Sequence, residues 1–154
     1  MNEVETYAAK AGLNFEMGYN CAQSVFGSLA ELSGMDAQLA FKLAAPFGLG
    51  ASYSVSLCGA LSGGLMALGS VFGNSGPDSE LKLHNYAMGS QLVERFRTQF
   101  GNVECAKLLG MEIRSEADLA EAREKCVFKD KCSFYVTQAT RMACEIMLTH
   151  KKEL

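Results

Sequence analysis

The sequence predicts an all-α protein, a single compact helical bundle of seven or eight helices over residues 1–154. No stretch alternates between apolar and polar residues with the period of two that a half-buried strand requires. Apolar residues instead recur at helical spacing in several segments, and good N-capping residues precede most of those segments. The chain contains neither an internal repeat nor a low-complexity linker. We therefore expect one domain with one core.

Capping and breaking residues place the expected helices in order along the chain. Suitable N-caps precede the expected helices: Asn20, Asp36, Ser54 or Ser56, Asp78 or Ser79, Asn102 and Ser115. Pro46 ends the helix that Asp36 begins. A Gly- and Ser-rich loop follows Pro46, and GNSGPDS at 73–79 marks a second loop. We expect helices over 3–17, 21–32, Asp36 to Ala45, 57–72, 78–100, a short segment after Asn102, 116–125 and 130–150.

Composition and charge argue against nucleic acid and membrane partners. The formal net charge is -3 and no basic run precedes the terminal His-Lys-Lys, so we expect no nucleic acid partner. Residues 43–77 carry no charge, but Gly, Ser, Pro46 and Asn74 dilute their hydrophobicity. This stretch therefore predicts a buried helix with its leading loop, and no membrane span. The polar, acidic N-terminus is unlike a secretory signal, which predicts a cytoplasmic protein with reduced thiols.

The six cysteines differ in their position on the expected helices. Cys126 lies at a helix C-terminus and Cys144 in the middle of a helix, as a plain packing residue would. The other four lie where helices begin: Cys21, Cys58, Cys105 and Cys132. At a helix N-terminus, unpaired N–H groups and the macrodipole favour thiolate, the form that binds metals and reacts. Helix position therefore separates four candidate functional thiols from two others.

The spacing of these cysteines excludes the common local metal motifs. No CxxC or CxxCH occurs, so neither a zinc ribbon nor a c-type haem is expected. A metal site would have to be assembled from distant segments. The alternative is that the cysteines act as small buried hydrophobic residues.

The residues around Cys58 resemble a known family. CGALSG at 58–63 matches the CGAxxG motif of the family labelled C_GCAxxG_C_C, whose members are described as redox-active. The resemblance extends from Asn14 to Leu148 and includes NCAQSV (20–25), GLG (48–50), GGLMALG (63–69), ECAKLLG (104–110) and KC (131–132).

This resemblance implies a role for the cysteines. The family's four characteristic cysteines correspond to Cys21, Cys58, Cys105 and Cys132, and the resemblance carries no role for Cys126 or Cys144. It implies redox activity or metal binding, with an iron–sulfur cluster as the natural cofactor and zinc as the alternative. Similar domains are joined to haem segments in split-Soret cytochromes, which favours electron transfer and a redox partner protein.

Three functions remain open at this point. The first is a redox-active protein that holds a metal or an iron–sulfur cluster on the four cysteines and transfers electrons. The second is an enzyme, a thiol–disulfide oxidoreductase in which Cys58 is the attacking thiolate. The third is a structural module with a zinc site or packed thiols. An exposed apolar face could also support a homodimer, and His84 is more readily an ordinary histidine than a ligand.

Overall fold

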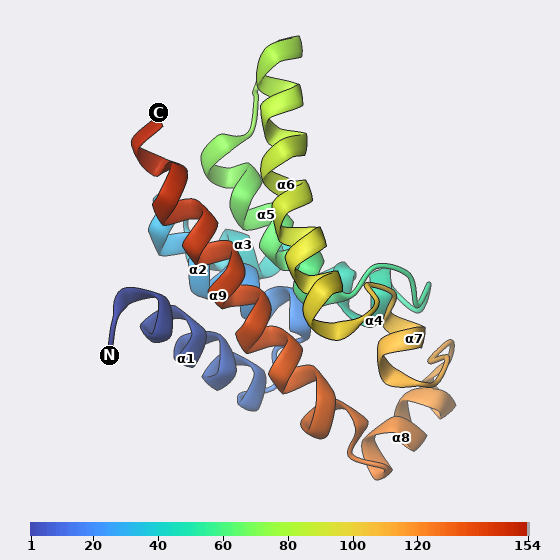
Figure 1. The fold of residues 1–154 in the computed structure, drawn as a ribbon. Coiled ribbons are helices and arrows are strands. Elements are labelled where there is room, and N and C mark those ends of the chain that lie inside the picture. The colour runs from blue at the N-terminus through green and yellow to red at the C-terminus, as the bar shows by residue number, and fades with distance from the viewer. Residues whose placement is uncertain (154) are drawn as a thin grey trace.

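Helices account for nearly all of the regular structure in the computed structural model, which describes residues 1–153 (Figure 1). The predicted fold class is confirmed: within those residues the only bridge between extended segments is an isolated antiparallel one, Leu57 to Glu104. The α-helical segments are α1 (Glu3–Glu16), α2 (Cys21–Ser33), α3 (Ala37–Ala44), α4 (Gly48–Ala51), α5 (Gly59–Phe72), α6 (Ser79–Phe100), α7 (Cys105–Leu109), α8 (Glu116–Glu124) and α9 (Ser133–His150). A 3-10 turn at Ala45–Phe47 precedes α4, and a π-helix at Phe128–Cys132 precedes α9.

The predicted helix caps are confirmed at four positions. Each capping side chain accepts a hydrogen bond from a backbone N–H two or three residues further on, which satisfies a donor that has no partner within the helix. The capping residues are Asn20, Asp36, Asp78 and Ser115. Local sequence therefore sets the start of α2, α3, α6 and α8.

The α2 helix lies at the centre of the bundle. It contacts α1, α3, α5 and α9, and almost all of its side chains after Cys21 are buried. Even the polar residues Ser24 and Ser28 are fully buried, so most of this helix belongs to the core. Gly63 of α5 faces the first turn of α2, where a Cβ atom would lie 2.5 Å from the carbonyl oxygen of Ala22. The backbones of α2 and α5 are therefore in close contact near their first turns, next to Cys21 and Cys58.

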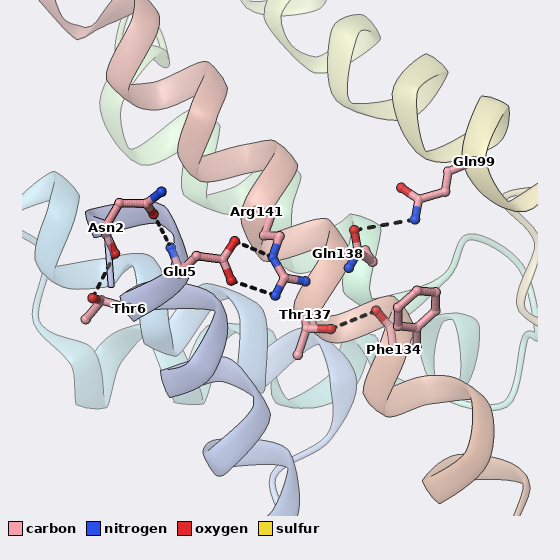
Figure 2. A network of polar contacts seen from close by, with 8 residues as sticks. All are labelled: Asn2, Glu5, Thr6, Gln99, Phe134, Thr137, Gln138 and Arg141. Carbon is pink, nitrogen blue, oxygen red and sulfur yellow. Dashed lines mark hydrogen bonds and ion pairs between the residues drawn. The ribbon is translucent and has the colours of Figure 1, made fainter.

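The α9 helix crosses the bundle and contacts α1, α2, α5 and α6 (Figure 1). Polar side chains fix α1 and α6 to its outer faces (Figure 2). The Arg141 guanidinium donates two hydrogen bonds of 2.7 Å to the Glu5 carboxylate, and Gln99 of α6 donates one of 3.4 Å to Gln138. The bidentate pair is partly exposed, so it contributes more to the orientation of α1 than to stability.

The buried side chains form two clusters. The larger one lies between α2, α5, α6 and α9 and includes Cys58 and Cys144. The smaller one lies at the end of the molecule that α7 and α8 cover, and it includes Cys105 and Cys132 (Figure 1). Among residues 1–153, no helix has both the length and the apolar character needed to cross a membrane.

Candidate functional site

Cys21 is the first residue of α2, as predicted, and its backbone is held by a capping box. The Asn20 carboxamide accepts from the Gln23 N–H at 2.9 Å, and the Gln23 side chain accepts from the Asn20 N–H at 3.1 Å. The backbone N–H groups of Ala22, Leu49 and Gly59 act on the Cys21 sulfur as hydrogen-bond donors. Three separate segments therefore present donors to one sulfur atom.

Cys58 and Cys105 are brought together by backbone pairing. The Cys58 N–H donates to Val103 O at 2.8 Å, and the Cys105 N–H donates to Ser56 O at 2.6 Å. This pairing encloses the Leu57–Glu104 bridge. The prediction that both cysteines lie at helix starts is confirmed, although the helices begin slightly later than expected: α5 begins at Gly59, so Cys58 is its N-cap residue, and α7 begins at Cys105 itself. Asn102, predicted to cap the short helix, instead accepts from the N–H groups of Val103 and Glu104.

A left-handed turn, which includes Leu49 and Gly50 inside the short segment α4, precedes Cys58. Leu49, Gly50, Ala51, Ser52 and Tyr53 all have φ between 50° and 72°. This conformation costs an L-residue about 1–2 kcal/mol, so surrounding contacts must enforce it. The Val55 N–H donates to Leu49 O at 3.1 Å, the Ser56 N–H to Gly50 O at 3.0 Å, and the Ser52 hydroxyl to Pro46 O at 2.6 Å. The turn places the Leu49 N–H at the Cys21 sulfur.

The left-handed turn makes a prediction about glycine substitutions. Ala51→Gly removes the left-handed penalty but adds unfolded-state entropy, so it is expected to raise the free energy of unfolding by about 0.5 kcal/mol. Ala87→Gly, at an exposed position inside α6, is expected to lower it by about 1 kcal/mol. Urea denaturation of both variants measures the two changes. Equal destabilisation by both substitutions would contradict a left-handed Ala51.

Cys132 does not lie at a free helix N-terminus, contrary to the prediction from Asp130. It is the last residue of the π-helix Phe128–Cys132, and α9 continues directly from Ser133. The Ser133 N–H already donates to the carbonyl oxygens of Phe128 and Lys131. The donors that a helix start would offer to a thiolate are therefore occupied within the helical backbone.

The four predicted cysteines converge on one small cavity. Its volume is about 20 Å³, close to that of one water molecule, and it lies between α2, α5, α7 and α9. Besides Cys21, Cys58, Cys105 and Cys132, it is lined by Gly59, Leu108, Leu109 and Tyr135. The first three of these cysteines belong to segments far apart in the sequence, and the backbone contacts described above draw them together.

The remaining cysteines lie outside this cavity, as predicted. All six cysteines are free thiols. Cys126 is exposed and has a φ of 56°, just beyond the C-terminus of α8. Cys144 is fully buried in the middle of α9. His84 also lies elsewhere, with its ring edge-on to Phe72 at the outer end of the α5–α6 pair.

Burial dominates the electrostatics of the four thiols. Removal from water raises the pKa of each of them, and together with the neighbouring Cys21 it raises the pKa of Cys105 to about 12. Nearby cysteines raise the pKa of Cys58, Cys105 and Cys132 further. Backbone N–H groups lower it at Cys21 and Cys58, but by less than burial raises it. The expectation that helix starts make these thiols thiolates was therefore wrong for the protein without a bound cation.

The donor set fits a thiolate-bound metal group. Four sulfurs face one cavity, apolar side chains surround them, and N–H donors serve two of the sulfurs. At Gly59 a Cβ atom would come within van der Waals overlap of the Cys21 sulfur, so only glycine leaves this side of the cavity open. Within residues 1–153, however, no three His, Cys, Asp or Glu side chains are arranged to ligate a single metal ion.

A single zinc ion and a cluster of several metal atoms place different demands on this cavity. Four thiolates on one ion lie about 3.8 Å apart, because each metal–sulfur bond is about 2.3 Å and the angles are tetrahedral. The sulfurs here share a cavity without forming such a closed set. A cluster of several metal atoms is much larger than a cavity of about 20 Å³, so binding one would require the walls of the cavity to move outward. A single zinc ion would instead require the sulfurs to move inward.

Sequence reasoning missed Tyr135, Leu108 and Leu109. Tyr135 lies three residues after Cys132, which puts both on one face of a continuous helix. Leu108 lies three residues after Cys105, in the same relation. The spacing of apolar residues after each cysteine was the available signal for these lining positions.

The fold and the site define a class: an all-α protein in which cysteines from four segments surround one apolar cavity. The chain belongs to the family whose model is described as "Putative redox-active protein (C_GCAxxG_C_C)", and this model matches residues 19–146. No curated protein and no solved structure matches the chain.

Proposed function

We propose that the protein holds an iron–sulfur cluster on Cys21, Cys58, Cys105 and Cys132 and transfers electrons through it. The observation that supports this proposal is the convergence of these four thiols on one cavity. The family description supports redox activity in general terms. When bound, such a cluster supplies a one-electron redox centre.

The chain's own residues would bind, orient and shield that centre. Four thiolates supply the ligands, so loading releases their protons. The N–H groups of Ala22, Leu49 and Gly59 stabilise negative charge on the Cys21 sulfur, and those of Ala60 and Leu61 do so at Cys58. Donors of this kind favour the more negatively charged, reduced state and raise the reduction potential.

Water is largely excluded from the site. The side chains of Cys58, Cys105 and Cys132 are at most 9% exposed. Cys21 is partly exposed, whereas the other three residues are buried. A redox partner protein would therefore exchange electrons mainly across the shell of protein around the cavity. The same burial, together with the raised pKa of Cys58, disfavours Cys58 as the attacking thiolate of a thiol–disulfide oxidoreductase.

Cysteine replacement under anaerobic conditions tests the proposed function. Reconstitution of the wild-type chain with iron and sulfide is expected to give bound iron, bound sulfide and visible charge-transfer absorption. Single Cys→Ser changes at the four site positions are expected to reduce bound iron at least about tenfold, since loss of supporting groups alone costs 10- to 100-fold. Iron and sulfide analysis with reversible bleaching by a reductant provides the measurement.

Two further cysteines supply matched controls. Cys126→Ser and Cys144→Ala lie outside the cavity and are expected to retain the wild-type iron content. A colourless protein that binds one zinc ion per chain through the same four cysteines would replace the cluster with a structural zinc site. Failure of the wild-type chain to bind either metal would contradict the proposal altogether.

A further inference from the structure

Two side chains hold the C-terminal end of α7. The Tyr135 hydroxyl donates to Leu108 O at 3.1 Å, and the Lys131 ammonium group donates to Leu109 O at 3.2 Å. The last carbonyl groups of a helix have no partner within it, so both bonds satisfy acceptors that would otherwise need water. With only five residues, α7 depends on such contacts to stay helical.

Both donors flank Cys132. Lys131 directly precedes it, and Tyr135 follows it by about one helical turn. The helix that they hold begins with Cys105. The two hydrogen bonds therefore join the segment that carries Cys105 to the segment that carries Cys132.

The Tyr135 ring is itself fixed, which makes it a rigid anchor. It packs edge-on against Phe100, with ring centroids 4.9 Å apart, and against Phe96 at 5.9 Å. The same ring lines the cavity between the four thiols. Its hydroxyl bond to Leu108 thus holds α7 over the cavity from the α9 side.

We propose that Tyr135 and Lys131 are positioning residues that set the separation of Cys105 from Cys132 and keep α7 closed over the thiol cavity. The inference rests on the proposed function, because a prearranged set of ligands has a purpose only if a cofactor binds to it. Its geometry is a property of the chain without any bound group, so it can be tested separately from cofactor binding.

Site-resolved alkylation of the metal-free protein tests this inference. Tyr135→Phe removes the hydroxyl and keeps the ring, and Lys131→Met removes the second donor. Each variant is expected to increase the iodoacetamide labelling rate of Cys105 about fivefold, because the loss of one ordinary hydrogen bond makes local opening about fivefold more frequent. Tyr135→Phe is expected to increase the rate at Cys132 by the same factor. In Lys131→Met the rise at Cys132 is expected to be smaller, since the lost ammonium charge lowers the pKa of that thiol. The labelling rates of the exposed Cys126 and of the fully buried Cys144, which both lie outside the cavity, are expected to stay within about twofold of wild type. Mass spectrometry of the digested protein reports each cysteine separately.

Matched controls separate positioning from general loss of stability. Tyr53→Phe alters a tyrosine packed on the same apolar cluster, and Lys129→Met alters a lysine of the same π-helix. Neither is expected to change labelling at Cys105 or Cys132. A parallel rise at Cys144 in Tyr135→Phe or Lys131→Met would indicate general unfolding and would overturn the inference, as would unchanged rates at all sites.

The cofactor measurement stays independent of this result. If selective labelling is observed but the wild-type chain binds no iron, the positioning role holds and the proposed function fails. If iron binds normally and the labelling rates do not change, the proposed function holds and this inference fails. With iron bound, both variants are expected to release it to a chelator about fivefold faster than wild type.

Discussion

Gly59→Ala is expected to abolish cofactor loading while the helical fold remains. The added Cβ atom would overlap the Cys21 sulfur, lie 3.0 Å from Phe47 O and lie 3.4 Å from the Ala22 N–H nitrogen. Two of these neighbours are backbone atoms, so the Cys21 side chain must move. Because the Cys21 sulfur lies between donors from three segments, its displacement removes one ligand from the site. Bound iron after anaerobic reconstitution is expected to fall at least about tenfold.

Gly69→Ala is the matched control for this experiment. Gly69 belongs to the same helix, α5, and a Cβ atom there would meet nothing within 4 Å. The substitution is expected to raise the free energy of unfolding by about 1 kcal/mol and to leave iron content unchanged. Circular dichroism checks that both variants stay helical. Normal iron loading in a folded Gly59→Ala protein would show that the Cys21 sulfur is not held against Gly59 as described.

The sequence was sufficient to predict the fold class and the cysteines that meet. Asn20, Asp36, Asp78 and Ser115 act on N–H groups within three residues, so local sequence determines those helix starts. The separation of the four cavity cysteines from Cys126 and Cys144 also holds. The spatial grouping holds although Cys132, unlike Cys58 and Cys105, does not lie at a helix start.

The geometry of the site depends on contacts that the sequence does not reveal locally. Cys58 and Cys105 meet through backbone pairing between distant segments, and no side-chain pattern marks that pairing. Residues 49–53 form a left-handed turn although only Gly50 favours that conformation. Cys132 follows a π-helix where a helix start was expected. In each case tertiary packing overrides local preference.

The thiol pKa values show a second reason why the site could not be predicted fully from the sequence. The prediction weighed the helix dipole, whose effect at an exposed site is about 0.3–1 kcal/mol. It had no access to burial, which is a larger effect and acts in the opposite direction. The N–H donors at Cys21 are present as expected, yet removal from water raises its pKa. For a buried thiol, a bound cation rather than the helix dipole is what makes the thiolate stable.

Gly63→Ala is expected to destabilise the whole bundle, in contrast to Gly59→Ala. A Cβ atom at Gly63 would lie 2.5 Å from the carbonyl oxygen of Ala22 and 3.0 Å from Cβ of Val25. Neither atom is at the flexible end of a side chain, so α2 and α5 must separate where their backbones are in close contact. Overpacking of this kind costs about 3 kcal/mol, and the helix propensity of alanine offsets about 1 kcal/mol of that.

The net loss of about 2 kcal/mol corresponds to a decrease in Tm of roughly 4–8 °C for a chain of this size. Thermal denaturation monitored by circular dichroism measures it, with Gly69→Ala expected to shift in the opposite direction. Because Gly63 lies one turn beyond Gly59 on the face of α5 toward α2, the two substitutions separate the demands of packing from those of the site. If Gly63→Ala matched Gly69→Ala in Tm, α2 and α5 would not be in the close contact on which the position of Cys21 beside Cys58 depends.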